Sequence, residues 1–388
     1  MSTTRTKQGQ PNADVEDSAT MSLWLDGASR SHPPLDNDVT ADVAVVGAGI
    51  AGIATAYFLA TAGASVVVLE ARGVAEAASG RNAGFLLAGV AENFVAATRR
   101  YGEPRALRIW RFTRRTQSLV RALVEEHRID CQLGWNGSDQ IAGDDEEWGE
   151  IEASARRLST EGVAVSVNSA TRSATYPDDG ELDPVRWVRG LAAAAVKKGA
   201  RIHESTRVDA IAPGEARTAT GVVRASAIVL CTNAYTAHLA LSRVRPVRGQ
   251  MLATAAAGPV FARPSYANRG YRYWRQTSDG RVLVGGWRDT AVDEEVGEEE
   301  RATEVIQKQL DAFLRQHHVT SAVTHRWAGT MGFSHDALPY VGRAGAQVYV
   351  CGGFTGHGMA FGPACAELVA TLISTGAHPD AHLFDPAR

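Results

Sequence analysis

The stretch Ala41-Asp-Val-Ala-Val-Val-Gly47-Ala-Gly49-Ile-Ala-Gly52 decides the fold, because an apolar run here ends in three spaced glycines. A second apolar run, Ser65-Val-Val-Val-Leu-Glu70, ends at an acid eighteen residues after Gly52. This order predicts a buried strand, a tight turn, a helix over Ile50–Thr61 and a second parallel strand. We therefore expect a dinucleotide-binding strand–helix–strand unit over about 38–92.

Each glycine has a separate task in such a unit. Gly47 permits the turn, Gly49 leaves room for phosphates, and Gly52 lets the helix pack close to the strand. The N–H groups at the start of the helix bind a pyrophosphate. The carboxylate of Glu70 accepts hydrogen bonds from ribose hydroxyls and favours a free ribose over a 2′-phosphate.

Three further segments contain motifs in a fixed order. They are Ala78-Ser79-Gly80-Arg81-Asn82-Ala83-Gly84, then Arg326-Trp-Ala-Gly-Thr-Met-Gly-Phe-Ser-His-Asp336-Ala-Leu-Pro339-Tyr-Val-Gly342, and Val348-Tyr-Val-Cys-Gly352-Gly353-Phe354-Thr355-Gly356-His357-Gly358-Met359. Over about Leu23 to Ile373 the chain resembles the D-amino-acid oxidase and sarcosine oxidase superfamily of flavoproteins. Within it, the chain looks most like the gamma-glutamylputrescine oxidase group.

The resemblance implies FAD as the cofactor. It also implies a Rossmann-like α/β FAD-binding domain of the glutathione-reductase type, interleaved with an α+β substrate domain built on an antiparallel sheet. Together with the glycine motif, it assigns these residues to the cofactor: Gly47, Gly49, Ile50, Ala51, Gly52, Glu70, Ala71, Arg72, Ser79, Gly80, Arg81, Asn82, Ala83, Gly84, Val208, Thr232, Asn233, Ala234, Gly353, Phe354, Gly356, His357, Gly358 and Met359.

The pattern of elements predicts how the two domains share the chain. We expect a largely disordered tail over 1–37, an FAD-binding domain over 38–92, 181–243 and 326–388, and a substrate domain over 93–180 and 244–325. In the substrate domain, Tyr271–Trp287 reads as a hairpin with Asp279-Gly280 at its turn. A helix follows, and the acids between Asp293 and Glu300 suit its N-terminus.

Composition favours a cytoplasmic enzyme. The chain has 388 residues, 45% of them hydrophobic, and a net charge of −3, which argues against nucleic acid as a partner. No run of about eighteen uninterrupted apolar residues occurs, so we expect no membrane span. The N-terminus lacks the layout of a secretory signal, and the four cysteines lack metal-ligand spacing, so we expect no metal.

The chemistry of a flavin suggests where the catalytic groups lie. Hydride transfer to flavin N5 leaves negative charge at N1 and the C2 oxygen, so the protein must direct positive dipoles there. The segment Gly356–Met359 opens the last helix, and its free N–H groups suit that charge. We name His357, Arg275, Tyr273 and Trp327 as catalytic candidates, and Arg275, Arg288 and His357 as cations that could assist oxygen.

The substrate class is predicted from one departure from the superfamily pattern. Members of the superfamily that act on α-amino acids commonly carry an arginine where this chain has Met331, which favours an amine without an adjacent carboxylate. Arg275 or Arg248 could still bind a carboxylate from another direction. The predicted reaction is oxidation of a small amine to an imine, with oxygen as acceptor and hydrogen peroxide as product.

The alternative is an amino-acid oxidase or dehydrogenase, acting on a D-amino acid, glycine or an N-methyl amino acid and passing electrons to a quinone or carrier. Sarcosine oxidases attach FAD through a cysteine in the segment that corresponds to Trp327–His335. This chain has none there, so we expect non-covalent FAD. The oligomeric state stays open.

Overall fold

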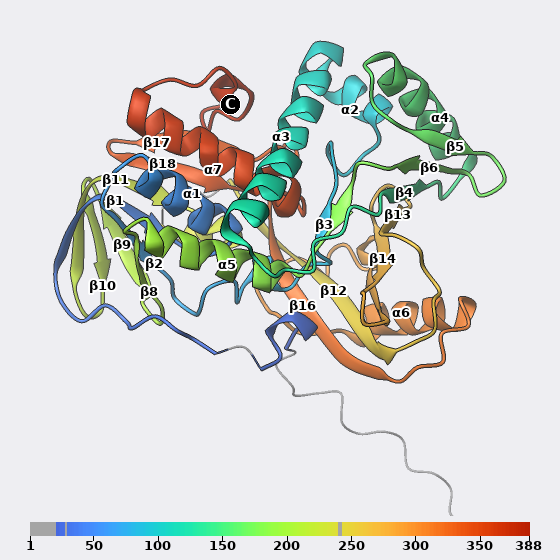
Figure 1. Ribbon diagram of the computed structural model, residues 1–388, viewed down its shortest axis with the longest axis horizontal. Helices are drawn as coiled ribbons and strands as arrows, with labels where there is room; N and C mark the ends of the chain where they lie inside the picture. Colours follow the sequence, from blue (N-terminus) through green and yellow to red (C-terminus); the bar gives the residue numbers. More distant parts are fainter. Residues whose placement is uncertain (1–20, 28, 240–242) are drawn as a thin grey trace, which may run out of the picture.

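The computed structural model describes residues 21–27, 29–239 and 243–388. Its first sheet is built around β1 (Val39–Val46), which pairs in parallel with β2 (Val66–Leu69) on one side and β11 (Val222–Leu230) on the other (Figure 1). The order is β17-β18-β11-β1-β2-β8, and β9 and β10 form a ribbon that joins β11. The remaining bounds are β8 Arg201–His203, β9 Val208–Ala212, β10 Glu215–Thr218, β17 Tyr340–Gly345 and β18 Val348–Gly352.

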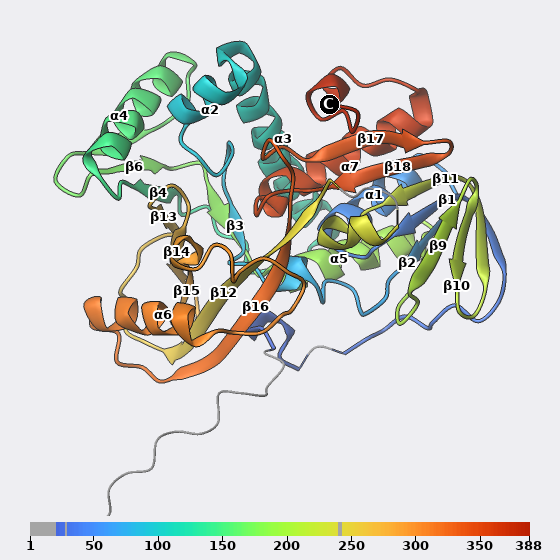
Figure 2. The same cartoon turned by 180° about the vertical axis from the view of Figure 1, so that it is seen from behind.

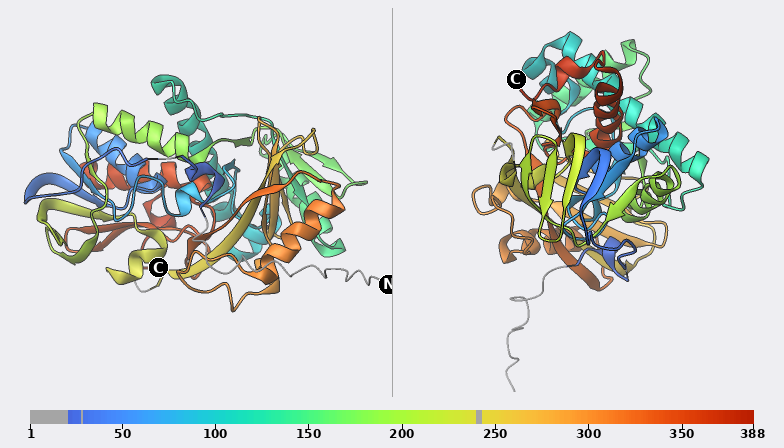
Figure 3. Two further views of the ribbon diagram at one scale, coloured as in Figure 1. Left: turned by 90° about the horizontal axis from the view of Figure 1, so that it is seen from below. Right: turned by 90° about the vertical axis from the view of Figure 1, so that its left-hand side faces the viewer.

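The central strands of this sheet are nearly continuous apolar runs because both of its faces are covered. One face packs with Val208 and Ala216 of β9 and β10, and the other is covered by helices. They are α1 (Ile50–Thr61), α3 (Glu103–His127), α5 (Pro184–Lys197) and α7 (Gly358–Thr375), with α1 packed between α5 and α7. Figure 3 shows the blue and yellow-green strands side by side with these helices on one side. Helix α7 is long and apolar enough to cross a membrane, but it packs against α1 and α3 in the core of the described chain.

The second sheet lies beside the first, and its long strands β12 and β16 run toward it (Figure 2). Its order is β16-β12-β15-β14-β13-β4-β6-β5, and α6 (Glu304–Gln316) packs on it through a cluster that includes Trp274 and Phe313. The strand bounds are β4 Ser138–Ile141, β5 Ser166–Asn168, β6 Ser173–Tyr176, β12 Arg245–Ala256, β13 Ser265–Ala267, β14 Arg272–Gln276, β15 Arg281–Gly286 and β16 Val323–Phe333.

Smaller elements join the two sheets. Strands β3 (Phe85–Leu86) and β7 (Gly180–Glu181) pair with each other, while α2 (Phe94–Tyr101) and α4 (Asp145–Thr160) pack together at the outer edge of the second sheet. Short 3₁₀ helices are η1 Leu23–Leu25, η2 Ala78–Gly80, η3 Asn233–His238, η4 Arg288–Thr290 and η5 Ala381–Leu383.

The predicted fold class is confirmed, and so is the hairpin with Gly280 at its turn. The structure divides the chain differently at three points. Strand β16 pairs with β12 as far as Phe333, so the second sheet extends past the expected boundary at 326. Helix α3, expected in the substrate domain, packs on α7 of the first.

The third difference concerns the expected N-terminal tail. Residues 1–20 lie outside the described part of the chain. Among the described residues from 21 to 37, Trp24 and Leu35 are buried, and the Trp24 indole donates to the Asn82 carbonyl at 2.7 Å. Expecting a largely disordered tail as far as residue 37 was therefore wrong for this part.

Candidate functional site

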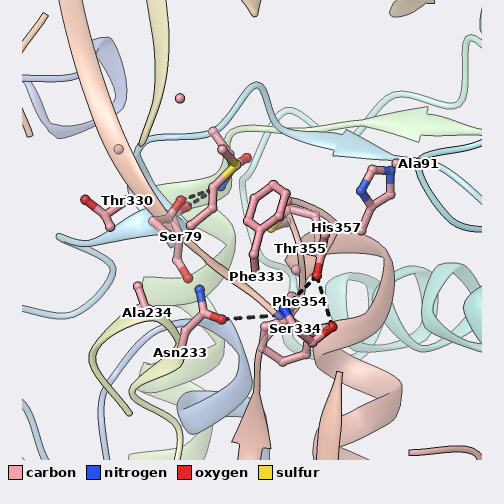
Figure 4. A pocket seen from close by; sticks show the side chains of 18 of the residues that line it. Ser79, Ala91, Asn233, Ala234, Thr330, Phe333, Ser334, Phe354, Thr355 and His357 are labelled. Atoms are coloured by element: carbon pink, nitrogen blue, oxygen red, sulfur yellow. Dashed lines mark hydrogen bonds between the residues drawn. The ribbon is translucent and has the colours of Figure 1, made fainter. Parts of the chain in front are cut away.

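A cavity of about 1460 Å³ runs between the two sheets, from the glycine turn after β1 to the loops beside α2 and α4. Figure 4 shows its centre, where Phe333 lies between Asn233 and Ala234 on one side and His357 on the other. The cavity is large enough for a dinucleotide with a small substrate beside it.

The glycine turn leaves space that larger residues would fill. Gly47 has a φ of +102°, which favours glycine. A Cβ on Gly49 would lie 2.9 Å from the Ser79 hydroxyl, which itself accepts the Ile50 N–H at 2.9 Å. The first-turn N–H groups of α1 have no acceptor within the helix, so this end suits a pyrophosphate.

Glu70 ends β2 at the edge of the same space. Its two carboxylate oxygens accept the backbone N–H groups of Ala48 at 2.7 Å and Arg72 at 2.8 Å. Burial raises the pKa of Glu70, and these two hydrogen bonds oppose that rise. The carboxylate is thus fixed in position, with lone pairs left for ribose hydroxyls.

The loop that follows β2 is held by its own asparagine. The Asn82 amide donates to the carbonyls of Ala78 at 3.0 Å and Ser79 at 2.8 Å, and its oxygen accepts the Gly84 N–H at 2.7 Å. The opposite wall is fixed in a similar way, because the Asn233 side-chain oxygen accepts the N–H groups of Gly353 and Phe354 (Figure 4).

Most of the residues predicted to hold the cofactor line the cavity together. They are Gly47, Gly49, Ile50, Ala51, Glu70, Ala71, Arg72, Ser79, Arg81, Asn82, Ala83, Val208, Thr232, Asn233, Ala234, Phe354, Gly356, His357, Gly358 and Met359. The cradle that these residues form fits FAD.

Four of the predicted cofactor residues lie outside the lining, and packing explains each. A Cβ on Gly52 would lie 1.9 Å from the Gly47 carbonyl oxygen, and one on Gly80 would lie 2.2 Å from that of Ala75. Gly84 and Gly353 face the Leu182 carbonyl and the Tyr340 ring in the same way. These glycines allow close packing behind the cavity, and their assignment to cofactor contact needs this correction.

Two of the four catalytic candidates, Arg275 and Trp327, are also outside the lining. The Arg275 side chain is 3% exposed, forms an ion pair with Glu181 at 3.3 Å and lies over the Trp24 ring. Trp327 is fully buried and donates its indole N–H to the Arg81 carbonyl at 3.0 Å. Neither side chain reaches the cavity, so both are corrected to structural roles.

Arg248, considered as a carboxylate binder, is likewise occupied. It forms a buried ion pair with Glu295 at 3.0 Å. Glu300, from the same acidic run, pairs with Arg72 at 2.7 Å and with Arg81 at 3.3 Å. These acids were expected to serve the N-terminus of the next helix, but two of them neutralise arginines instead.

The two remaining candidates, Tyr273 and His357, line the cavity next to other aromatic rings. Tyr266 is stacked on Tyr273 at 5.8 Å between ring centroids, and its ring lies 5.9 Å from that of His357. Phe85 packs edge-on against both tyrosines. Together these four residues form what we call the aromatic chamber.

Burial sets the ionisation of this chamber. It raises the pKa of Tyr273 to about 12 and raises that of Tyr266 further, so both phenols keep their protons. Burial lowers the pKa of His357 to about 4. His357 is therefore neutral at pH 7, which corrects the expectation that it could assist oxygen as a cation.

The lining residues that sequence reasoning missed include three aromatic ones, and it also missed one residue behind the lining. Tyr266 and Phe333 lie on β13 and β16, and Phe85 follows the Asn82 loop, so strands far apart in the chain bring them together. Glu300 lies behind the lining, where it forms ion pairs with Arg72 and Arg81. No local pattern singles out any of them.

Comparison with known proteins agrees with this arrangement. The sequence model described as FAD dependent oxidoreductase (DAO) matches residues 42–372. The chain belongs to this family. It is an FAD-dependent oxidoreductase whose relatives act on amines and amino acids.

Individual relatives of this DAO-family chain are distant but similar along most of their length. Gamma-glutamylputrescine oxidoreductase of Escherichia coli K12 is 28% identical, over 94% of this chain and 91% of that protein. Glycine oxidase of Geobacillus kaustophilus is 27% identical over 86% and 92%. The crystal structure of that glycine oxidase has a TM-score of 0.77 at 23% identity and covers 90% of this chain and 99% of the other, which supports the fold.

Proposed function

We propose that this protein oxidises a small amine at the C–H bond next to nitrogen, with molecular oxygen as the electron acceptor. The C–H bond loses a hydride and the nitrogen loses a proton to give an imine, and two electrons and two protons reduce oxygen to hydrogen peroxide. FAD supplies the chemistry that carries the electrons between the two half-reactions. Water then hydrolyses the imine.

One observation supports this proposal above the others: a single cavity joins the dinucleotide cradle to the aromatic chamber. A substrate in the chamber would lie beside the N-terminus of α7, where His357, Gly358 and Met359 line the cavity. The first-turn N–H groups of that helix would stabilise negative charge on the cofactor.

The chamber suits an amine because only the neutral amine can be oxidised. Low polarity there lowers the pKa of a bound ammonium group. The His357 Nδ1 atom is buried and has no hydrogen-bond partner in the described part of the chain, so in the tautomer that carries its proton on Nε2 it can accept an amine N–H. The phenol of Tyr273 can form a hydrogen bond with the same nitrogen or with a polar group next to it on the substrate.

The names of the relatives support the reaction class. Gamma-glutamylputrescine oxidoreductase and glycine oxidase both point to a C–H bond next to nitrogen. We place the protein in the cytoplasm, with no nucleic acid or membrane as partner.

The decisive test is anaerobic reduction of the purified holoprotein. A panel of polyamines, N-methylated amines, glycine and D- and L-amino acids is added, and loss of the visible flavin band is followed. We expect bleaching by an amine, and peroxide release once air is admitted. Bleaching without peroxide in air would favour a dehydrogenase, and no bleaching by any compound would refute the proposal. The His357→Asn variant should slow bleaching while retaining FAD.

A further inference from the structure

Arg288 is a lining residue whose charge the proposed chemistry has not used. It begins η4, directly after β15, and faces the cavity. Its guanidinium carbon lies 4.9 Å from the centroid of the Tyr271 ring and 5.0 Å from that of the Phe333 ring. Two aromatic rings therefore lie against the guanidinium.

The charge of Arg288 lacks an acidic partner. Within residues 21–27, 29–239 and 243–388, no carboxylate lies within 4.0 Å of its nitrogens, by the distance that defines the ion pairs elsewhere in the chain. The adjacent acid, Asp289, turns away and contacts Asn268 at 3.0 Å and Arg272 at 3.7 Å.

Of the other arginines that line the cavity, Arg207 also has no acidic partner within 4.0 Å in the described part of the chain, but it is exposed beside Val208 at the cofactor end. The rest differ from Arg288. Arg72 pairs with Glu300, and three arginines at the outer end pair in the same way: Arg99 with Glu150, Arg100 with Glu92, and Arg269 with Asp144. Those charges are neutralised by the protein itself. Arg288 is left to a ligand.

Arg288 lies close to the aromatic chamber. Burial raises the pKa of Tyr273, and the positive charge of Arg288 acts on the same phenol in the opposite direction. A guanidinium can present two parallel N–H groups, which match the two oxygens of a carboxylate.

We infer that Arg288 binds a carboxylate of the substrate, so that the amine oxidised here carries an anionic group at some distance from the reacting nitrogen. This inference rests on the proposed function and adds a substrate class to it. Arg288 is then a specificity-determining residue. The rival role is that of a cation that speeds the reaction with oxygen, and the two roles affect different half-reactions.

Matched substrates and variants separate these roles. Anaerobic flavin reduction by 4-aminobutyrate is compared with reduction by butylamine, in which a methyl group replaces the carboxylate. The variants are Arg288→Gln, Arg288→Lys, and Arg272→Gln as control. Arg272 also lies over an aromatic ring, that of Trp287, but lies outside the lining of the cavity.

In Arg288→Gln, the half-saturation concentration for 4-aminobutyrate should rise about 10–100-fold, which is the range for loss of a charge-assisted hydrogen bond. The limiting reduction rate and all constants for butylamine should change little. The half-saturation concentration for Arg288→Lys should lie between those of the parent protein and Arg288→Gln. Lysine keeps the positive charge but cannot donate two parallel N–H groups to one carboxylate. Arg272→Gln should match the parent protein.

Binding of butyrate by calorimetry gives a readout that needs no turnover, and it should weaken in Arg288→Gln to the same extent. Equal half-saturation for 4-aminobutyrate in parent and variant would overturn the inference, as would a change confined to reoxidation by oxygen. Failure of every amine to reduce the flavin would instead refute the proposed function, and the inference with it.

Discussion

Replacing Gly52 by alanine tests whether the dinucleotide cradle depends on close contact between α1 and the turn before it. The new Cβ would lie 1.9 Å from the Gly47 carbonyl oxygen and 3.3 Å from the Cys231 Cβ. Real Cβ atoms essentially never approach closer than 3.0 Å, so α1 or the turn must move by about 1.1 Å, the difference between 3.0 and 1.9 Å. The nearest atom, the Gly47 carbonyl oxygen, belongs to the backbone and cannot move away by a side-chain rotation.

The magnitude follows from two opposing effects. Overpacking a tight site costs about 1–3 kcal/mol. Alanine recovers about 0.8–1.0 kcal/mol of helix propensity. We expect the free energy of unfolding of the apoprotein to fall by about 0–2 kcal/mol as the net of these two effects. FAD affinity should also fall about 10–100-fold, because the shift misaligns N–H groups that meet a charged pyrophosphate.

The assay combines chemical denaturation of the apoprotein with titration by FAD, followed through quenching of flavin fluorescence. Gly149→Ala is the matched control, since Gly149 lies inside α4 with nothing within 4 Å of its added Cβ. That change should stabilise the protein by about 0.8–1.0 kcal/mol and leave FAD affinity unchanged. If Gly52→Ala behaved like Gly149→Ala in both measurements, the packing argument would be refuted.

Four further outcomes are expected. Glu70→Gln should weaken FAD binding about tenfold by fluorescence titration, because one of the two backbone N–H groups that Glu70 accepts would face an amide NH₂. Since burial lowers the pKa of His357 to about 4 from 6.5, its unfolded form binds more protons in that range. Stability should therefore fall as pH drops through that range, and denaturation curves of His357→Gln should show a smaller drop. Burial raises the pKa of Asp179 to about 6 from 3.8, so its native form favours low pH, and Asp179→Asn should gain stability relative to the parent between pH 4 and 7. Acid precipitation should release the flavin into the supernatant, and colour retained in the pellet would contradict non-covalent binding.

The nucleotide end of the site could be predicted from sequence because its determinants are local. The helix predicted over Ile50–Thr61 has those bounds in the structure. Turn, helix start and Glu70 lie within about thirty residues, and each is read from glycine spacing and apolar runs. The backbone does most of the binding there, so few side chains need to be identified.

The substrate end could not be predicted in the same way. Strand alternation places Tyr273 and Arg275 on one face of β14. It cannot show that Gly84, Glu181 and Trp24 cover Arg275. These covering residues come from three distant segments. Tertiary contacts therefore decide which arginine reaches the cavity. Strand alternation alone cannot show that Arg288 lines the cavity while Arg275 does not.

The same long-range contacts explain why the two domains interleave along the chain. Arg72 and Arg81 belong to the cofactor side, and their like charges lie close enough that each disfavours the other. Glu300, from the segment after β15, pairs with both, at 2.7 Å and 3.3 Å, and the Tyr235 phenol of η3 donates a hydrogen bond to the same carboxylate. Without that carboxylate, two guanidinium groups would repel each other beside the cavity. The second domain therefore supplies a counter-charge that the cofactor cradle needs, besides covering the substrate, so cradle and chamber form as one unit.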